Sequence, residues 1–295
     1  MECILSEFDI PGFFNISEIR NNIWDIDDAY ILKKTNDFDC VKKITELTRQ
    51  LSDKGVLAVR FIAANNGEFY VKHDDEYFAL MHKVRGGHMD IHNGDSMTKA
   101  KQIGENTALL CRTFESCVYD GGPRFEYDMI KFINGEYGDA TNRGIERVSK
   151  EILGYINDFH PLYKKLPRQI IHKDLNPSNI MFDGDKFQGF IDFDMVQRNV
   201  RIYDLCYLLQ DVFQNNPEIA KCIYESYDKI NPLTQEEKQA IPYMLVMIGV
   251  LESIWTFNHG DNMNGDKKSL SDFHIKRTEW MFENRLLFAK VVFCE

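Results

Sequence analysis

The most restrictive feature of this 295-residue chain is a polar run, HKDLNPSN, at residues 172–179, enclosed by short apolar segments. The segment QII precedes it, and the segments NIMF and FQGFIDF flank the turn sequence DGDK at residues 183–186. Short apolar runs separated by a glycine-containing turn are typical of β-hairpins. We therefore predict a hairpin within residues 169–194 that carries several polar side chains.

The hairpin brings together side chains whose oxygen atoms suit a divalent cation. Asn179 begins one strand and Asp192 lies on the returning strand, so the two side chains can approach each other across the turn. Hard oxygen ligands of this kind suit magnesium, which keeps its other coordination positions for phosphate and water. Asp174, in the preceding loop, can orient and deprotonate a substrate hydroxyl. Such a set serves phosphoryl transfer, in which the protein positions the reacting oxygens and neutralises charge.

The chain divides into a strand-rich part and a helix-rich part. Residues 1–80 contain strand-like runs at 15–27, 28–34, 57–64, 68–73 and 76–84, together with one helical pattern that is expected to end at Gly55. The apolar residues of that helix, at helical spacing, are Val41, Ile44, Leu47 and Leu51. After a hinge at residues 81–84, residues 85–295 are mainly helical apart from the hairpin. We predict a two-lobed α+β protein with its ligand site in a cleft between the lobes.

The charge of the chain disfavours a nucleic-acid partner. Lys and Arg number 35 against 46 Asp and Glu, which gives a net charge of −11. A binder of duplex nucleic acid needs a basic face that displaces counterions. We expect no nucleic-acid partner, and the acidic balance mildly favours cationic or neutral small molecules.

The cysteines and the apolar segments indicate a cytoplasmic protein. The seven cysteines are scattered and form no Cys-x-x-Cys pair, which fits a reducing compartment. The N-terminus lacks the pattern of a secretory signal. The stretch YMLVMIGVL, which begins at Tyr243, meets Glu252 well short of the roughly 20 residues that a membrane span needs. A capping box, Thr234-x-x-Glu237, opens this region, so we predict a buried core helix and no membrane association.

The segment IIHKDLNPSNIMFDGDKFQGFIDFDMVQRNVRIYDLCYLL resembles the catalytic core of the aminoglycoside phosphotransferase and choline kinase-like superfamily, whose members are small-molecule kinases with the protein-kinase fold. The resemblance implies that Asp174 is the catalytic residue that positions or deprotonates the acceptor hydroxyl, and that His172 braces its loop. It implies that Asn179 and Asp192 bind Mg²⁺, and that Asp204 anchors the loop. It further implies ATP or GTP as the phosphoryl donor, with the acceptor pocket built by the helices after the hairpin.

The resemblance extends more weakly into the small lobe. DDAYILKK is similar to the family's strand that carries a phosphate-contacting lysine, which strand alternation assigns to Lys33 rather than to Lys34. The helix that bears Glu46 resembles the family's helix whose glutamate pairs with this lysine. EYFALMHKVRGG looks like the last strand and hinge. The resemblance implies an adenine site there. Met81 would border this site, and the residues from His82 to Val84 would offer backbone groups to adenine. No glycine-rich phosphate loop precedes Lys33, and the sequence IRNNIWDID stands in its place.

The acceptor is left open by the sequence. An aminoglycoside-type acceptor is the leading interpretation, with homoserine, choline or a sugar as alternatives. A catalytically silent nucleotide-binding regulator and a metal-dependent phosphohydrolase are the competing functions. Asp194 fits either a metal neighbour or a turn residue. Three acidic residues either contact a cationic acceptor or are surface residues exposed to solvent: Glu252, Asp261 and Asp266.

Overall fold

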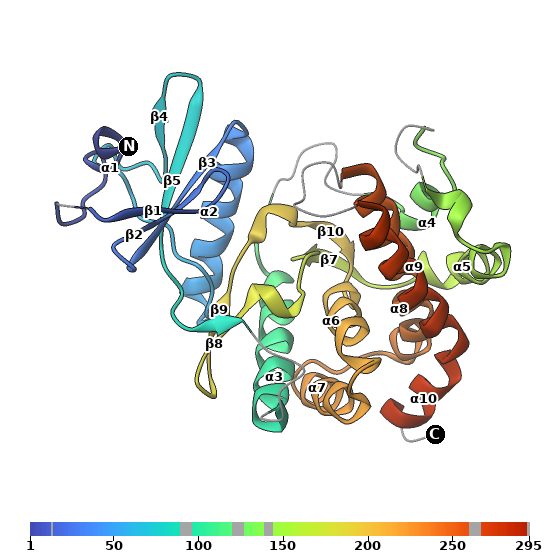
Figure 1. Ribbon diagram of the computed structural model, residues 1–295. Helices are drawn as coiled ribbons and strands as arrows, with labels where there is room; N and C mark the ends of the chain where they lie inside the picture. Colours follow the sequence, from blue (N-terminus) through green and yellow to red (C-terminus); the bar gives the residue numbers. More distant parts are fainter. Residues whose placement is uncertain (13, 89–95, 120–126, 139–143, 260–266, 294–295) are drawn as a thin grey trace.

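The computed structural model describes residues 1–12, 14–88, 96–119, 127–138, 144–259 and 267–293. An N-terminal part built on one sheet lies beside a C-terminal part built mostly of helices (Figure 1). This arrangement confirms the predicted α+β fold with a small antiparallel lobe and a larger helical lobe. The lobe boundaries expected on either side of residues 81–84 stay predictions.

The small lobe is organised around a five-stranded antiparallel sheet with the strand order β1-β2-β3-β5-β4. Its strands are β1 (Ile16–Arg20), β2 (Ile23–Ile26), β3 (Tyr30–Thr35), β4 (Val71–His73) and β5 (Glu76–His82). Leu32 and Leu80 lie in a buried cluster with Leu5, which belongs to the short helix α1 (Glu2–Leu5). Because side chains alternate along a strand, Lys33 projects from β3 on the face opposite to Leu32.

Helix α2 (Phe38–Asp53) confirms the helix predicted before Gly55. The carboxylate of Asp37 caps its first turn by accepting the N–H of Cys40 at 2.9 Å. Gly55 follows the helix with a φ of 82°, a left-handed conformation that glycine adopts without steric cost. The predicted apolar stripe is at most 8% exposed and consists of Val41, Ile44, Leu47 and Leu51. The last three of these residues belong to the same core cluster as the helices of the large lobe.

The strand predicted at residues 57–64 is wrong, because this segment forms only isolated bridges. The N–H of Val59 donates to the carbonyl of Phe190 in the large lobe at 2.9 Å, whereas the N–H of Ile62 donates to Leu80 in the small lobe at 2.8 Å. The extended backbone thus changes partner after a few residues. It ties the two lobes together and does not extend either sheet.

The large lobe consists mainly of helices. They are α3 (Ser96–Phe114), α4 (Met129–Ile133), α5 (Lys150–Tyr163), α6 (Tyr203–Phe213), α7 (Pro217–Ile230), α8 (Gln235–His259), α9 (Lys267–Glu283) and α10 (Arg285–Phe293). In Figure 1, helices α6 to α10 lie on the side of the molecule away from the small-lobe sheet. They back the region of residues 168–200, where the chain forms short strands and loops.

The predicted hairpin is formed by β8 (Ile180–Asp183) and β9 (Lys186–Phe190), and the short strand β6 (Gly87–His88) adds to its edge. The preceding strand, β7 (Arg168–Ile171), pairs instead with β10 (Gln197–Val200). The strand β10 was not predicted, because its residues QRNV carry only one apolar side chain. Two separate antiparallel pairs therefore flank the polar run at residues 172–179.

Helix α8 begins with the predicted capping box. The N–H of Glu237 donates to the hydroxyl of Thr234 at 3.2 Å, and the N–H of Thr234 donates to the Glu237 carboxylate at 2.9 Å. The same carboxylate accepts hydrogen bonds from both Nε and Nη2 of Arg201, at 2.8 and 2.5 Å. Because Glu237 is fully buried, this two-bond pairing satisfies a charge that would otherwise be costly to bury.

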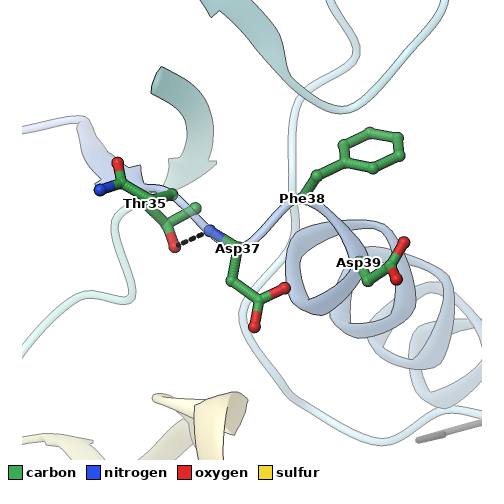
Figure 2. A pocket seen from close by; sticks show the side chains of 5 residues that line it. Thr35, Asp37, Phe38 and Asp39 are labelled. Carbon is green, nitrogen blue, oxygen red and sulfur yellow. Dashed lines mark hydrogen bonds between the residues drawn. The ribbon is translucent and has the colours of Figure 1, made fainter. Parts of the chain in front are cut away.

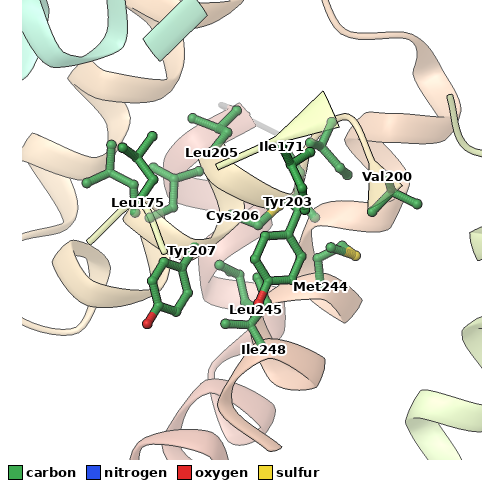
Figure 3. Close-up of a cluster of buried hydrophobic side chains, with 14 of the residues drawn as sticks. Ile171, Leu175, Val200, Tyr203, Leu205, Cys206, Tyr207, Met244, Leu245 and Ile248 are labelled. Atoms are coloured by element: carbon green, nitrogen blue, oxygen red, sulfur yellow. The ribbon is translucent and has the colours of Figure 1, made fainter. Parts of the chain in front are cut away.

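By length and composition, one described helix, α8, could cross a membrane, but 72% of its apolar window is buried inside the protein. Figure 3 shows Met244, Leu245 and Ile248 of this helix beneath Tyr203 and Tyr207 of α6, with Ile171 and Leu175 of the polar loop region above them. All of these side chains are at most 6% exposed. The predicted core helix therefore supports the loop that carries the candidate site.

Candidate active site

The loop between β7 and β8 is held by hydrogen bonds to its backbone. The carboxylate of Asp204, in the first turn of α6, accepts the N–H groups of His172 and Lys173, each at 2.8 Å. Lys173 has a φ of 69°, which is uncommon for a residue other than glycine. Burial raises the pKa of Asp204 to about 7 although both N–H donors oppose the shift. Asp204 thus anchors the loop, as the sequence resemblance implied.

His172 is fully buried and connects the loop to the segment that follows the hairpin. Its Nε2 lies 3.0 Å from the carbonyl oxygen of Ile191, and its ring packs against Phe193. Burial lowers the pKa of His172 to about 4, so the imidazole is neutral at pH 7 and donates its Nε2–H to the carbonyl. This placement suits a structural brace and leaves proton transfer to a neighbouring carboxylate.

Asp174 lies in the loop with its carboxylate held on several sides. Asn176 Nδ2 donates to Oδ1 at 2.9 Å, Asn179 Nδ2 donates to Oδ2 at 3.0 Å, and the hydroxyl of Tyr207 lies 3.4 Å from Oδ1. Burial and the negative charge of Asp192 raise the pKa of Asp174, while these three donors oppose the shift. A carboxylate with a raised pKa is a stronger proton acceptor, and its fixed orientation suits a general base.

Asn179 and Asp192 are brought together by the start of the β8–β9 hairpin. The N–H of Ile191 donates to the backbone carbonyl of Asn179 at 3.1 Å, so Asp192 follows directly after this contact. Asp192 itself adopts a left-handed conformation with a φ of 61°. A strained backbone conformation of this kind is often found at functional sites, where the surrounding structure maintains it.

The small lobe contributes a lysine to the same place. Lys33 Nζ lies 3.5 Å from Asp192 Oδ1 and also forms an ion pair with Asp194. The neighbouring Lys34 points elsewhere and pairs with Glu76 at 2.7 Å. The side chains of Lys33 and Asp192 are 24% and 26% exposed, so a ligand can reach both. Lys33, which strand alternation predicted, is thus the lysine that faces the large lobe, and Asp194 is one of its partners.

The expectation that Glu46 pairs with Lys33 is wrong for this structure. Both carboxylate oxygens of Glu46 accept hydrogen bonds from Arg49, at 3.0 and 2.8 Å, one helical turn away on α2. The Glu46 side chain is 52% exposed. The two residues share a helix face by their spacing of three, which is a local preference that the correspondence with a distant family could not reveal. A binding role for Glu46 therefore has no support from this geometry.

The hinge residues lie at the end of β5 and just beyond it. Met81 is half-buried and forms a bridge with Phe61. The N–H of His82 already donates to the carbonyl of Arg60, and the N–H of Lys83 donates to Ala29, each at 2.9 Å. If adenine takes a backbone donor from this segment, we expect it to come from Val84. The adenine-binding roles of Met81, His82 and Val84 stay predictions.

A hollow of about 670 Å³ opens at the start of α2 and is lined by residues 35–39 (Figure 2). The carboxylates of Asp37 and Asp39 lie in its wall, and the N–H of Asp37 donates to the hydroxyl of Thr35 at 3.1 Å. Two carboxylates would repel a polyphosphate, so this hollow is unsuited to the phosphates of a nucleotide. Its lining does not include Asp174, Asn179 or Asp192.

Glu252, for which the sequence left acceptor contact and surface solvation open, is half-buried on α8 and shares the hydroxyl of Tyr207 with the proposed base. Burial, followed by the charge of Asp174, raises the pKa of Glu252 to about 7, while a hydrogen bond from Tyr207 opposes the shift. The charge of Arg277 lowers the pKa of Glu252 and that of Asp211 raises it, and these two residues form an ion pair with each other. Tyr207 thus lies between two carboxylates, Asp174 and Glu252, and has one proton to donate to them. Asp261 and Asp266 lie outside the described residues.

The Glu252→Gln variant is expected to lose a pH dependence of stability. The pKa of Glu252 rises from 4.5 in a free side chain to about 7 in the folded protein, so the folded state binds the additional proton between these pH values. The contribution of Glu252 to the free energy of unfolding is therefore fully present below pH 4.5 and is lost as pH rises through about 7. The loss is on the order of 3 kcal/mol.

Urea unfolding at several pH values measures this effect. Between about pH 5 and about pH 8, the free energy of unfolding should decrease less in Glu252→Gln than in the wild type. Glu236→Gln, an exposed change on the same helix, should keep the wild-type slope. Equal slopes for the wild type and the Glu252 variant would contradict the assignment.

The residues present fit a magnesium ion by the chemistry of their donor atoms. Both hydrogens of Asn179 Nδ2 are used by Asp174, at 2.7 Å to its carbonyl and 3.0 Å to its carboxylate, which leaves the amide oxygen as an acceptor. Asp192 adds a carboxylate. Among the described residues, no group of three or more His, Cys, Asp or Glu residues could hold a metal by itself. Two oxygen donors would bind a cation that takes its other ligands from phosphate and water.

Several solved structures share the fold of this protein. An aminoglycoside phosphotransferase from Alicyclobacillus acidocaldarius superposes with a TM-score of 0.71 at 15% identity, over 100% of this chain and 95% of that chain. An amicoumacin kinase in complex with AMP-PNP, Ca²⁺ and Ami superposes with a TM-score of 0.69 at 15% identity, over 92% of this chain and 88% of that chain. At this identity the likeness concerns the fold, which is the two-lobed fold of small-molecule kinases.

The family follows from the sequence match. The model of the phosphotransferase enzyme family matches residues 17–228, which is most of the chain, and the chain belongs to this family. Curated relatives include the homoserine kinase of Zymomonas mobilis, 37% identical over 107 residues, and that of Gluconobacter oxydans, 31% identical over 115 residues. These matches cover 34% and 37% of this chain, and 32% and 36% of the two kinases. The matched segment thus spans about a third of the length of these relatives.

Proposed function

We propose that the protein transfers the γ-phosphoryl group of ATP or GTP to a hydroxyl group of a small molecule. The observation that carries the proposal is the meeting of Lys33 and Asp192 from opposite lobes, 3.5 Å apart and next to the oriented carboxylate of Asp174. Family membership supports it, as does the amicoumacin kinase structure, which contains a nucleotide analogue and a divalent cation.

Each residue has a defined task in this proposal. Asp174 orients the acceptor hydroxyl and takes its proton on a carboxylate oxygen as the oxygen attacks the γ-phosphorus. Lys33 binds the phosphates that are not transferred and stabilises the leaving nucleoside diphosphate. Asn179 and Asp192 would hold Mg²⁺, which when bound neutralises charge on the phosphates. The free cysteines at positions 3, 40, 111, 117, 206 and 222 support a cytoplasmic location, where nucleoside triphosphates are available.

For the acceptor, we propose a small molecule that carries both a hydroxyl and an amino group. The Glu252 carboxylate lies beside Asp174 and would attract an ammonium group near the reacting hydroxyl. Homoserine has both groups and is favoured by the sequence matches to homoserine kinases. An aminoglycoside is the second candidate, favoured by the aminoglycoside phosphotransferase fold match.

An acceptor screen tests the proposed function. Purified protein is incubated with Mg²⁺ and ATP or GTP, and release of nucleoside diphosphate is measured with homoserine, aminoglycosides, choline and sugars. We expect release that depends on one acceptor class and a phosphorylated product detectable by mass spectrometry. Release without any acceptor would indicate a phosphohydrolase. Nucleotide binding without release under any condition would indicate a silent regulator.

A further inference from the structure

An arginine on the first hairpin of the small lobe faces the same carboxylate as Lys33. Arg20 ends β1, and only Asn21 and Asn22 separate it from Ile23, its partner at the start of β2. The carbonyl of Asn22 accepts the N–H of Lys34 at 2.9 Å. The turn is therefore tied to the strand that carries Lys33, and the positions of the two cations are coupled through the sheet.

The two cations contact opposite oxygens of one side chain. Arg20 Nη2 lies 3.3 Å from Asp192 Oδ2, while Lys33 Nζ lies 3.5 Å from Asp192 Oδ1. The Arg20 side chain is 64% exposed, and ion pairs this exposed add little to stability. Structural stabilisation is thus a weak explanation for an arginine that reaches across to the other lobe.

The turn that presents Arg20 replaces a glycine-rich phosphate loop. Glycine-rich loops bind phosphates through backbone N–H groups, because the absence of a Cβ lets the backbone come close. No glycine occurs between residues 13 and 33, so every residue of this hairpin carries a Cβ. A guanidinium reaches further than a backbone amide and binds phosphate through two parallel N–H donors.

We propose that Arg20 binds the γ-phosphate of the nucleotide, in place of the backbone donors of a glycine-rich loop. This inference rests on the proposed function, since it concerns the donor of that reaction. Asp192, the proposed metal ligand, is the group that holds Arg20 while no phosphate is bound. When nucleotide and cation bind, the guanidinium exchanges this carboxylate for oxygens of the γ-phosphate. Arg20 stays charged throughout. It neither gains or loses a proton nor forms a covalent bond.

Calorimetric titration with two nucleotides tests the proposal without any acceptor. Arg20→Ala is expected to weaken binding of the ATP analogue AMP-PNP with Mg²⁺ by about tenfold to a hundredfold, which is typical for a lost charge-assisted hydrogen bond. Binding of ADP with Mg²⁺ should change less than about threefold, because ADP lacks the γ-phosphate. Arg20→Lys should recover part of the loss, since it keeps the charge without the two-donor geometry.

The controls separate this role from others. Arg112→Ala removes an exposed arginine from the last turn of α3 and should leave both affinities unchanged. Equal losses for AMP-PNP and ADP would show that Arg20 only holds the lobes together, and unchanged affinities would show that it does not contact the nucleotide. Either result overturns the proposal. Binding is measured without an acceptor, so failure to find an acceptor would count against the proposed function and not against Arg20.

Discussion

Asp174→Asn is expected to reduce the turnover of an identified acceptor by about 10²–10⁴-fold, the range typical for removal of a general base. The substituted amide has nearly the same shape but cannot take a proton from the attacking hydroxyl. Its oxygen can still accept one of the hydrogen bonds that Asn176 and Asn179 make to the carboxylate. The affinity for Mg²⁺ and nucleotide should therefore remain close to that of the wild type.

Steady-state kinetics and calorimetry on the same preparations measure these two effects. Asp183→Asn changes an exposed aspartate at the end of β8 and serves as the matched control with wild-type turnover. Melting temperatures of all three proteins establish that they are folded. If the Asp174 variant keeps a wild-type rate, the assignment of the base is wrong. If it loses nucleotide binding as well, Asp174 acts on the nucleotide and not on the acceptor.

Asp192→Asn is expected to remove the magnesium dependence of nucleotide binding. The variant keeps a residue type that tolerates the left-handed conformation at this position but loses the charge that would attract the cation. Turnover should fall by at least about a hundredfold, since a catalytic metal supplies several kcal/mol of charge stabilisation in the transition state. Without Mg²⁺, nucleotide affinity should be equal to or higher than that of the wild type, because Lys33 and Arg20 lose the carboxylate that competes with phosphate.

Titration of nucleotide with and without Mg²⁺ tests both parts of this prediction. Asp185→Asn, on the turn of the same hairpin, removes a carboxylate that lies 3.6 Å from Lys99 and should behave as the wild type does. A variant of Asp192 that still requires Mg²⁺ for binding would refute its role as a metal ligand. Weaker binding without Mg²⁺ would show that Asp192 does not compete with phosphate for the two cations.

Several local features of the structure were predicted correctly from residues close together in the sequence. The capping box of α8, the apolar stripe of α2 and the β8–β9 hairpin were all predicted from residues within a few positions of one another. Strand alternation alone separated Lys33 from Lys34. These features depend on short-range hydrogen bonds and on the spacing of apolar side chains, both of which are visible in a single segment.

Other parts of the site depended on residues far apart in the chain. Arg20 contacts Asp192 because the first hairpin of the small lobe lies against the large lobe. The sequence of this hairpin contains no motif that predicts the contact. Tyr207 and Glu252 face Asp174 because α6 and α8 pack beneath the loop. Glu46 was predicted to pair with Lys33, but Arg49 on the same helix is its partner.

Patterns of nearby residues predicted most of the helices and strands, the order of a strand-rich and a helix-rich part, and the short polar run with its oxygen-bearing side chains, but not the bridges of residues 57–64 or the strand β10. The packed fold assigns the partners of charges and strand edges: Arg20 and Lys33 lie with Asp192, Glu46 with Arg49, and β7 pairs with β10. Helices and strands form largely from interactions between nearby residues, whereas a charge or a strand edge pairs with the group that core packing places next to it.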